Sequence, residues 1–342
     1  MIIVFFVYLG IAMCKEDLKV KILIAYHRQS ELLKSEIYTP IHVGRDVAMR
    51  KSKDGLISKE NFQWLTDNMV GDNTGDNISY KNLRYNELTA LYWAWKNYDA
   101  LGTPDYIGLM HYRRHFIFNT EKKNPSFRMM TASGLYPFVN MTPAYMEFID
   151  EKYIHKYFPE NDCLVVNSLD VKQIGRKNCR AQFASFAKQD VQNFDICCDT
   201  VKSLYPDFSD AIDKLYTDSK LYVCNMFVMK KELFFEYCSF LFTVLEKLEN
   251  IIKINDNDPV AARTLGFLGE FLLTIFILNL QNRPGIKVSE AGASIVLSPD
   301  SVIIKKYWMY KILRYVTWGV SRYRYQCKCR VAENYFKQTL VM

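Results

Sequence analysis

The 342-residue sequence has little glycine and proline, 14 and 10 residues respectively, and no low-complexity stretch. These absences exclude a collagen-like chain and a flexible linker protein. No heptad pattern persists, which excludes a coiled coil. Hydrophobic residues make up 49% and charged residues 24%, the balance of a globular chain rather than a disordered one. A chain of this length buries a large core without disulfide or metal support.

Paired cysteine motifs are also missing. The nine cysteines are scattered, none belongs to a CxxC pair, and their number is odd. An odd, scattered set argues against a complete disulfide framework. We therefore expect a reducing, cytoplasmic compartment.

The first 13 residues form an apolar run that is too short to cross a bilayer. The run lacks the basic start and the small cleavage-site residues of a signal peptide. A weak signal or anchor and a buried strand are alternative interpretations. We favour a start codon assigned too early, with Met13 as the true start, and treat residues 1–18 as an extension.

Acidic residues are absent between Lys305 and Arg330, a segment with eight lysines and arginines. The whole chain has a formal net charge of +7, so the remainder is close to neutral. A nucleic-acid-binding protein needs an extended basic face on its fold, and we expect no nucleic-acid partner.

Residues 301–342 form a basic tail that is also aromatic. Within 307–318, lysine and arginine alternate with Trp, Tyr and aliphatic residues, which suits the headgroup region of an anionic membrane. A helix packed on the domain with a basic outer face is the alternative. We expect a cytoplasmic protein that is peripheral to the inner membrane through this tail.

Short apolar segments alternate with helical patterns over about 300 residues. The strand candidates are 19–26, a short segment near 38–45, 106–110, 162–167 and 221–229. The helix candidates are 82–97, 232–249 and 259–280, the last with Asp258 as its N-cap. Residues 121–142 read as irregular. This alternation predicts one α/β domain over 19–300.

Polar residues follow the predicted strands, where the ligand crevice of an open α/β sheet lies. Tyr26 and His27 end the first strand, and His42 and Arg45 end the second. Asn225 lies at the centre of the predicted strand 221–229. We predict that these residues bind the ligand of that crevice.

The segment 71–77 repeats Gly-Asp-Asn twice and predicts a loop, because Asn and Asp bond their own backbone and Gly takes positive φ. Asp72, Asn73, Asp76 and Asn77, with Glu87 on the following helix, are further candidates, which could bind ribose or sugar hydroxyls. Turn formation and helix capping explain the same residues without a ligand.

The strand 106–110 leads directly into His111-Tyr112-Arg113-Arg114-His115. A polar cluster at the end of a buried strand is typical of an α/β ligand site. Arg113 and Arg114 can form bidentate bonds to phosphate oxygens, and His111 can donate a hydrogen bond or a proton. A solvated surface loop is the alternative.

Glu270 is a lone carboxylate in the apolar stretch 266–272. Apolar surroundings raise the pKa of a carboxyl toward values useful to a general base. A structural partnership with Arg263 is equally consistent with the sequence.

Several of these strings resemble a glycosyltransferase family of bacterial capsule and exopolysaccharide gene clusters, first catalogued as a domain of unknown function. The strings are 41–45, 71–79, 85–97, 106–114, 225–229 and 266–270. The resemblance covers 19–280 and implies a GT-A-like, Rossmann-type mixed sheet flanked by helices. The sequence has Phe271 where the family more often has Arg, so a role carried by that Arg is not implied.

The resemblance also implies a nucleotide-sugar donor, here a UDP-sugar. The binding residues of the crevice and of the 71–77 loop, with Glu87, thereby become donor-binding candidates. Its acceptor would be a capsular or exopolysaccharide chain or a lipid-linked oligosaccharide. Some relatives are described as galactosyl- or galactofuranosyltransferases, which suggests a hexose.

In a GT-A domain the strand after the helix ending at residue 97 normally closes with an Asp-x-Asp pair and its metal. Here His111, Arg113 and Arg114 take that place. The departing diphosphate needs positive charge from a metal or from fixed cations. We predict a transferase without cofactor or metal, in which Arg113 and Arg114 stabilise the leaving group, His111 assists by hydrogen bonding and Glu270 deprotonates the acceptor hydroxyl.

Two alternatives remain. A transferase dependent on Mn²⁺ or Mg²⁺ would use Asp256 and Asp258, or Asp72 and Asp76. The 256–258 segment resembles an Asp-x-Asp signature, but it opens a predicted helix, which favours capping. A non-catalytic interaction module, tethered to a membrane complex by the tail, would need no donor site.

Overall fold

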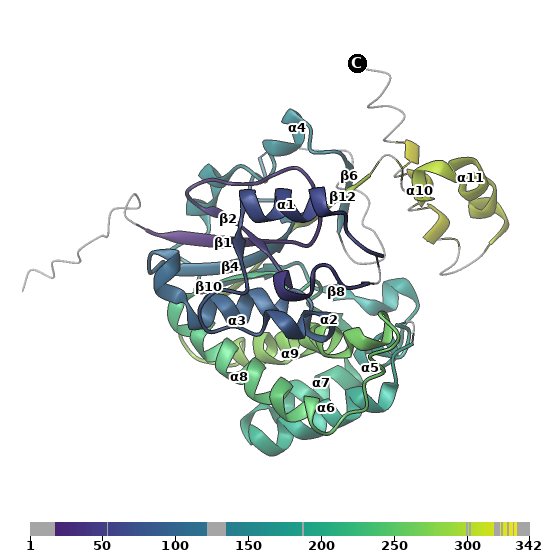
Figure 1. The fold of residues 1–342 in the computed structure, drawn as a ribbon. Helices are drawn as coiled ribbons and strands as arrows, with labels where there is room; N and C mark the ends of the chain where they lie inside the picture. Colours follow the sequence, from purple (N-terminus) through teal and green to yellow (C-terminus); the bar gives the residue numbers. More distant parts are fainter. Residues whose placement is uncertain are drawn as a thin grey trace, which may run out of the picture.

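The structure is a computed structural model that describes residues 18–333 apart from 53, 122–134, 187, 299, 301, 318–321, 323, 327 and 331. The apolar extension 1–17 lies outside the described residues. A mixed sheet forms the centre of the domain, with helices on both sides (Figure 1). The predicted α/β class is confirmed.

Four parallel strands form the first half of the sheet, in the order β4-β1-β2-β3. They are β1 (Val20–Tyr26), β2 (Tyr38–His42), β3 (Val70–Gly71) and β4 (Tyr106–His111). Because helices and loops cover both faces, β1 and β4 are almost wholly buried and read as continuous apolar runs.

The second half of the sheet is mixed. β10 (Phe227–Lys230) runs antiparallel to both β4 and β7 (Cys163–Val166), and β11 (Val288–Ala291) runs parallel to β7. Three strands branch from the end of β4: β5 (Arg114–Phe116), β12 (Ala293–Leu297) and β6 (Tyr136–Val139). A separate pair joins β8 (Leu169–Asp170) and β9 (Lys220–Leu221).

Helices α3, α8 and α9 lie along one face of the sheet, with α6 and α7 outside them, whereas α1 and α4 lie toward the other face (Figure 1). The helices are α1 (Lys59–Asn68), α2 (Asn82–Tyr85), α3 (Leu88–Lys96), α4 (Pro143–Met146), α5 (Cys179–Phe183), α6 (Val191–Leu204), α7 (Ser209–Thr217), α8 (Lys231–Glu249), α9 (Thr264–Leu280), α10 (Val302–Lys305) and α11 (Tyr307–Val316). Short 3-10 turns lie at Arg45–Val47, Ser79–Lys81, Tyr98–Leu101, Glu151–Lys156, Val171–Ile174, Pro206–Phe208 and Ala261–Arg263.

One segment of the described chain, Ala261–Leu280, is long and apolar enough to cross a membrane, with a mean hydropathy of 1.7. However, 78% of the 18-residue stretch that has this hydropathy is buried within the protein. It packs against α6, α7 and α8, so α9 belongs to the core. The seven cysteines in the described part of the chain are buried free thiols.

Four predicted elements need correction. The helix predicted over 82–97 is broken at Asn86, whose φ of 52° ends α2 and turns the chain into α3. The helix predicted from 259 begins at Thr264, after a 3-10 turn. The strand predicted over 221–229 is two strands, β9 and β10. Residues 121–142, predicted to be irregular, contain β6 in their described part.

Asn225 therefore does not lie at the centre of a strand. It lies in the turn before β10, where Cys224 and Asn225 both adopt positive φ, 72° and 51°. A strand pattern of apolar residues does not reveal such a turn, because the backbone conformation is imposed by tertiary contacts.

Gly108 in β4 tests how closely the sheet is packed. A Cβ on Gly108 would lie 2.5 Å from the Phe227 carbonyl oxygen and 2.8 Å from Val228 Cγ2. We expect Gly108→Ala to cost about 3 kcal/mol of stability by overpacking, seen as a lower Tm by differential scanning fluorimetry.

Gly102→Ala is the control. Its φ of 76° strains alanine, but its Cβ meets nothing within 4 Å, so about 1 kcal/mol is expected. Equal losses of Tm in the two variants would show that the sheet has room for a methyl group at Gly108.

Candidate active site

A cleft opens at the carboxyl ends of β1 and β2 and offers about 740 Å³ of free space, its open mouth included. This is where an open α/β sheet binds ligands. The polar residues on its walls come from five segments: His27, His42, Arg50, Ser52, Asp54, Asn82, Asn86, Glu87 and Arg263. Of the predicted site residues, His27, His42 and Glu87 line this cleft.

Asp72 organises the wall of the cleft without facing it. Its buried carboxylate accepts hydrogen bonds from the backbone N–H groups of Gly44 (2.6 Å) and Arg45 (3.1 Å). The hydroxyls of Ser79 (2.5 Å) and Thr89 (2.6 Å) donate to the same carboxylate. Asp72 therefore ties the turn after β2 to α3, and its oxygens are occupied within the chain.

Arg45 determines which ring nitrogen of His42 carries the proton. The guanidinium donates to the carbonyl of Met69 at 2.8 Å, and its Nε donates to His42 Nδ1 at 3.2 Å. Gly71 leaves room for it, since a Cβ there would lie 2.5 Å from Arg45 Nη1. Burial, with Arg45 and His27 nearby, lowers the pKa of His42 to about 3.

His42 is therefore neutral at physiological pH, with its proton on Nε2. That buried Nε2 has no hydrogen-bond partner among the described residues, and His42 lies on the cleft wall. A buried donor without a partner costs free energy unless a ligand or water accepts from it.

The corner at Asn86 joins the cleft to α9. Arg263 Nε donates to Asn86 Oδ1 at 3.1 Å. Gly266 permits this approach, because a Cβ there would lie 1.8 Å from Asn86 Nδ2. The next residue, Glu87, accepts a hydrogen bond from Asn225 Nδ2 at 2.8 Å. The corner thus brings together residues from α2, α9 and the turn before β10.

A charged cluster adjoins Glu87. Arg114, the first residue of β5, lies within electrostatic reach of Glu87 and Glu270. Its Nε is buried and has no hydrogen-bond partner in the part of the chain that the structure describes. His111 Nε2 lies 2.6 Å from the carbonyl oxygen of Cys224. Hence the cluster combines Glu87, His111, Arg114, Asn225 and Glu270.

The carboxylates of the cluster titrate differently. Burial, with Glu87 nearby, raises the pKa of Glu270 to about 7, against the opposing charge of Arg114. Burial alone would raise the pKa of Glu87, but His111, the Asn225 amide and Arg263 lower it below its ordinary value. Burial lowers the pKa of His111 to about 4, although Glu87 opposes that shift. At neutral pH, Glu87 is ionised and Glu270 is poised near its midpoint.

Arg113 and Arg28 extend the positive charge toward the cleft. Arg28 Nε donates to the Tyr112 hydroxyl at 2.9 Å, and the guanidinium carbons of Arg28 and Arg113 lie 5.4 and 5.6 Å from the centre of the Tyr112 ring. Arg113 also lies within electrostatic reach of Asp54 on the cleft wall.

The other predicted donor-binding residues have partners within the chain. The Tyr26 hydroxyl donates to the Glu31 carbonyl at 2.8 Å and accepts from Leu33 N–H. In the 71–77 loop, Asn73 donates to Asp46, Asp76 accepts from Tyr92, and Asn77 bonds its own turn. Like Arg45 and Asp72, these four residues do not line the cleft.

Several residues on the cleft walls are absent from the predicted site: Arg50, Ser52, Asp54, Asn82 and Asn86. Arg263 is predicted from the sequence only as a partner of Glu270. The glycine at 266 is a sequence signal for a close neighbour, because a helix position without a side chain admits one, and here that neighbour is Asn86.

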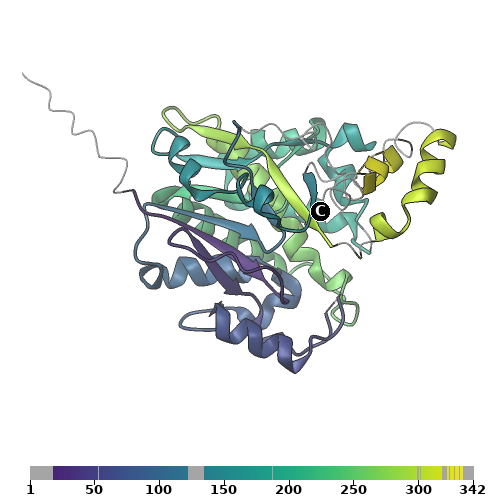
Figure 2. The ribbon, with the colours of Figure 1, turned by 90° about the horizontal axis from the view of Figure 1, so that it is seen from above.

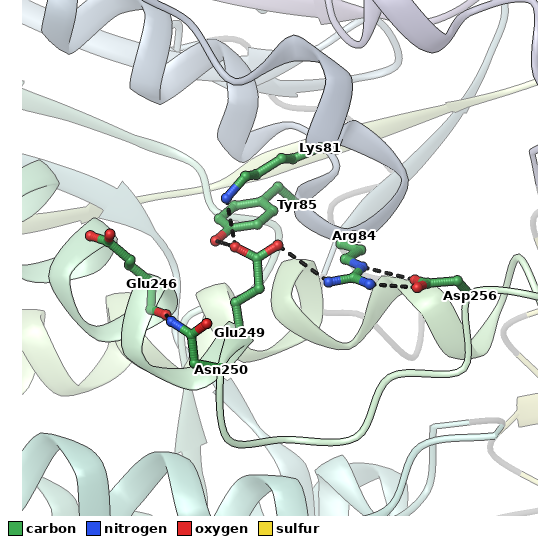
Figure 3. A network of polar contacts seen from close by, with 7 residues as sticks. All are labelled: Lys81, Arg84, Tyr85, Glu246, Glu249, Asn250 and Asp256. Carbon is green, nitrogen blue, oxygen red and sulfur yellow. Dashed lines mark hydrogen bonds and ion pairs between the residues drawn. The ribbon is translucent and has the colours of Figure 1, made fainter.

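Asp256 and Asp258, offered as metal ligands, both have partners within the chain. Arg84 forms two hydrogen bonds with Asp256, the one from Nε at 2.8 Å (Figure 3). Asp258 pairs with Lys188 and accepts from the backbone N–H groups of Val260 and Ala261. It therefore holds the turn before α9 and is not the N-cap of that helix, which is Arg263. No group of three His, Cys, Asp or Glu side chains gathers for a metal in the described ranges.

Figure 3 shows what the neighbourhood of Asp256 does instead. Lys81 Nζ lies 2.6 Å and the Tyr85 hydroxyl 3.1 Å from Glu249 Oε2, while Arg84 Nη1 lies 3.3 Å from Glu249 Oε1. This network fastens α2, and with it the Asn86 corner, to α8.

Glu270 makes stability depend on pH. Its folded pKa, about 7, lies above its ordinary value, so the unfolded chain binds fewer protons between the two pKa values and stability falls as pH rises. Glu270→Gln stays neutral. At about pH 8 we expect it to add up to about 3 kcal/mol to the free energy of unfolding and so to raise Tm. Near pH 4 we expect little effect.

Thermal melts of both proteins across this pH range measure the effect. Glu249→Gln is the control, because it removes a carboxylate paired with Lys81 and Arg84 and should lower Tm at about pH 8. A Glu270→Gln variant less stable than the parent at that pH would show that Glu270 is ionised and paired.

Comparison with known proteins places this chain. Residues 21–282 match the family model described as Domain of unknown function (DUF4422). The apo structure of the bifunctional glycosyltransferase WbbM is similar, with a TM-score of 0.68 and 32% identity. The match covers 81% of this chain but 45% of that one, so the chain spans less than half the length of that protein. No curated protein matches.

The matched range contains the cleft and the charged cluster and ends before the basic tail. The fold agrees with that of a glycosyltransferase structure, and the family resemblance predicted from the short strings is confirmed. The chain belongs to the DUF4422 family.

Proposed function

We propose that this chain transfers a glycosyl residue from a nucleotide-sugar donor to an acceptor hydroxyl. The observation that carries the proposal is the cluster of Arg114 and Glu270 beside the cleft. Arg114 is partly buried, and its buried Nε has no hydrogen-bond partner among the described residues. Glu270 is a carboxyl whose pKa is about 7. Similarity to the WbbM glycosyltransferase supports glycosyl transfer in general.

The donor in this proposal is a UDP-sugar that carries a hexose such as galactose or galactofuranose. The acceptor is a growing capsular or exopolysaccharide chain or a lipid-linked oligosaccharide. Both assignments rest on the resemblance of the sequence strings to glycosyltransferases of polysaccharide gene clusters.

Transfer forms one bond and breaks another. The acceptor oxygen attacks the anomeric carbon, and the bond from that carbon to the diphosphate oxygen breaks. The hydroxyl proton passes to the Glu270 carboxylate, which is available at neutral pH because its pKa is about 7. The electron pair leaves with the diphosphate, whose added charge is stabilised by Arg113 and Arg114.

Fixed cations replace the metal in this proposal. The site holds four arginines and three acidic residues, one of which, Glu270, is partly protonated, so its net charge is positive. The arginines are Arg28, Arg113, Arg114 and Arg263, and the other two acidic residues are Asp54 and Glu87. His111 is neutral and supports the turn at Cys224. A leaving diphosphate is therefore attracted without Mn²⁺ or Mg²⁺.

His42 serves the donor in this scheme. Its neutral Nε2–H can donate to a carbonyl or hydroxyl oxygen of the nucleoside part of the donor. Arg45 and Asp72, predicted as ligand contacts, then act as positioning residues that hold the His42 ring.

The first test measures donor binding and turnover with the same protein. Thermal shift is recorded against nucleoside diphosphates and UDP-, GDP- and dTDP-sugars, each with Mn²⁺ and with EDTA, because a ligand that binds only the folded chain raises Tm. Release of the nucleoside diphosphate from the stabilising sugar nucleotide measures turnover. We expect a shift with a UDP-sugar that survives EDTA, and turnover about 100-fold lower in Arg114→Lys.

Arg180→Lys is the matched control, since Arg180 pairs with Asp195 away from the cleft. Full turnover in Arg114→Lys would remove Arg114 from the mechanism. A shift that requires Mn²⁺ would favour a metal-dependent transferase. No shift with any nucleotide would favour a non-catalytic interaction module.

His42 is tested with two substitutions that keep different halves of the imidazole. Glutamine places an amide donor near the Nε2 position, whereas asparagine keeps an acceptor toward Arg45 but does not reach the cleft. By isothermal titration with UDP, we expect about tenfold weaker binding in His42→Asn, the loss of about one hydrogen bond, and near-parental binding in His42→Gln. Equal losses in both would make His42 a structural residue only.

A further inference from the structure

Helix α11 turns large apolar side chains to the solvent. Trp308, Ile312, Tyr315 and Val316 are 65–68% exposed, and Met309 is 43% exposed. At 100° per residue these five side chains occupy about one third of the helix circumference. They form one continuous face, the apolar face of α11.

The inner side of the helix is the one that packs. Tyr310 is buried and stacks with Tyr325 at 5.9 Å between ring centres. Ile304 and Ala332 form a small buried cluster with Leu297 and Tyr307 against it. A surface helix normally buries its apolar face and exposes its polar one. In α11 the exposed face is the apolar one.

The apolar face is bordered by cations. Lys311 lies over the Trp308 ring at 4.8 Å, and Lys305 and Lys306 precede the helix. Two carboxylates meet this region: Asp300 lies 3.1 Å from Lys305, and Glu333 lies 3.7 Å from Arg314. Residues 300–333 still carry a net charge of +6.

Both ribbon views show α10 and α11 projecting from the body of the domain (Figures 1 and 2). The projecting helix does not line the cleft. Its apolar face can therefore be covered from outside without obstructing the candidate active site.

We propose that the apolar face of α11 docks on the surface of a bilayer that contains anionic lipids. Trp and Tyr are the side chains that the interfacial region of a membrane favours, and Ile312 and Val316 supply the apolar area that enters it. The surrounding lysines and arginines meet the negative headgroups. This docking does not depend on the proposed glycosyl transfer.

The net charge of this segment favours a bilayer over a second copy of the chain as the partner of the apolar face. Two copies joined through this face would bring two segments of net charge +6 together, which is unfavourable. The helix is also too short, at 10 residues, to cross a bilayer. It lies on the surface rather than spanning it.

Vesicle co-sedimentation of the full chain tests the proposal. The vesicles contain phosphatidylcholine alone or mixed with phosphatidylglycerol. We expect binding to the anionic vesicles only, and about tenfold weaker binding after the double substitution Trp308→Ser and Ile312→Ser. The matched control is Leu204→Ser with Ile251→Ser, two apolar residues that are 40% and 47% exposed elsewhere on the surface.

Each remaining outcome overturns the proposal. Equal binding to neutral vesicles would remove the role of the cations. Binding that survives the Trp308 and Ile312 substitutions would place the contact elsewhere. If the chain binds no vesicles but sedimentation velocity shows a dimer that these substitutions dissociate, the apolar face pairs with a second copy. The thermal shift caused by UDP measures ligand binding in the cleft separately, and we expect these substitutions to leave it unchanged.

Discussion

The site depends on one electrostatic constraint, the partial removal of the Arg114 guanidinium from water. A buried cation is tolerated only where negative charge and hydrogen-bond acceptors meet it. Glu87, at the start of α3, supplies most of that charge at neutral pH, and Glu270, within α9, adds only its ionised fraction. Bringing both carboxylates to one arginine sets them close to each other, which is one reason why Glu270 holds its proton near neutral pH. Packing and acid–base chemistry thus have a common origin.

Much of the sheet could be predicted from the sequence. Strands β1 and β4 are buried on both faces, so their apolar runs stand out, and the cluster after β4 lies where such sheets bind ligands. The breaks at Asn86 and Asn225 could not be predicted in the same way. Both residues adopt positive φ, and their side chains bond to Arg263, just before α9, and to Glu87, both far along the chain.

The candidate site was predicted less completely, because residue type does not reveal whether a polar group already has a partner. Asp72 and Arg45 carry the chemistry of ligand contacts, yet both are occupied within the chain. Glu87 and His42 have similar chemistry and reach the cleft. The difference is tertiary. It depends on which loop folds back on which helix, and no local pattern encodes that.

Helix α9 also bears on how the chain is made. It has the hydropathy of a membrane span. If it stayed exposed during synthesis, it would promote aggregation or insertion into a membrane. Its main helical neighbours, α2, α6, α7 and α8, all precede it in the sequence. When α9 leaves the ribosome, the surfaces that cover it have already been synthesised. The order of elements along the chain therefore shortens the time for which its most apolar helix stays uncovered.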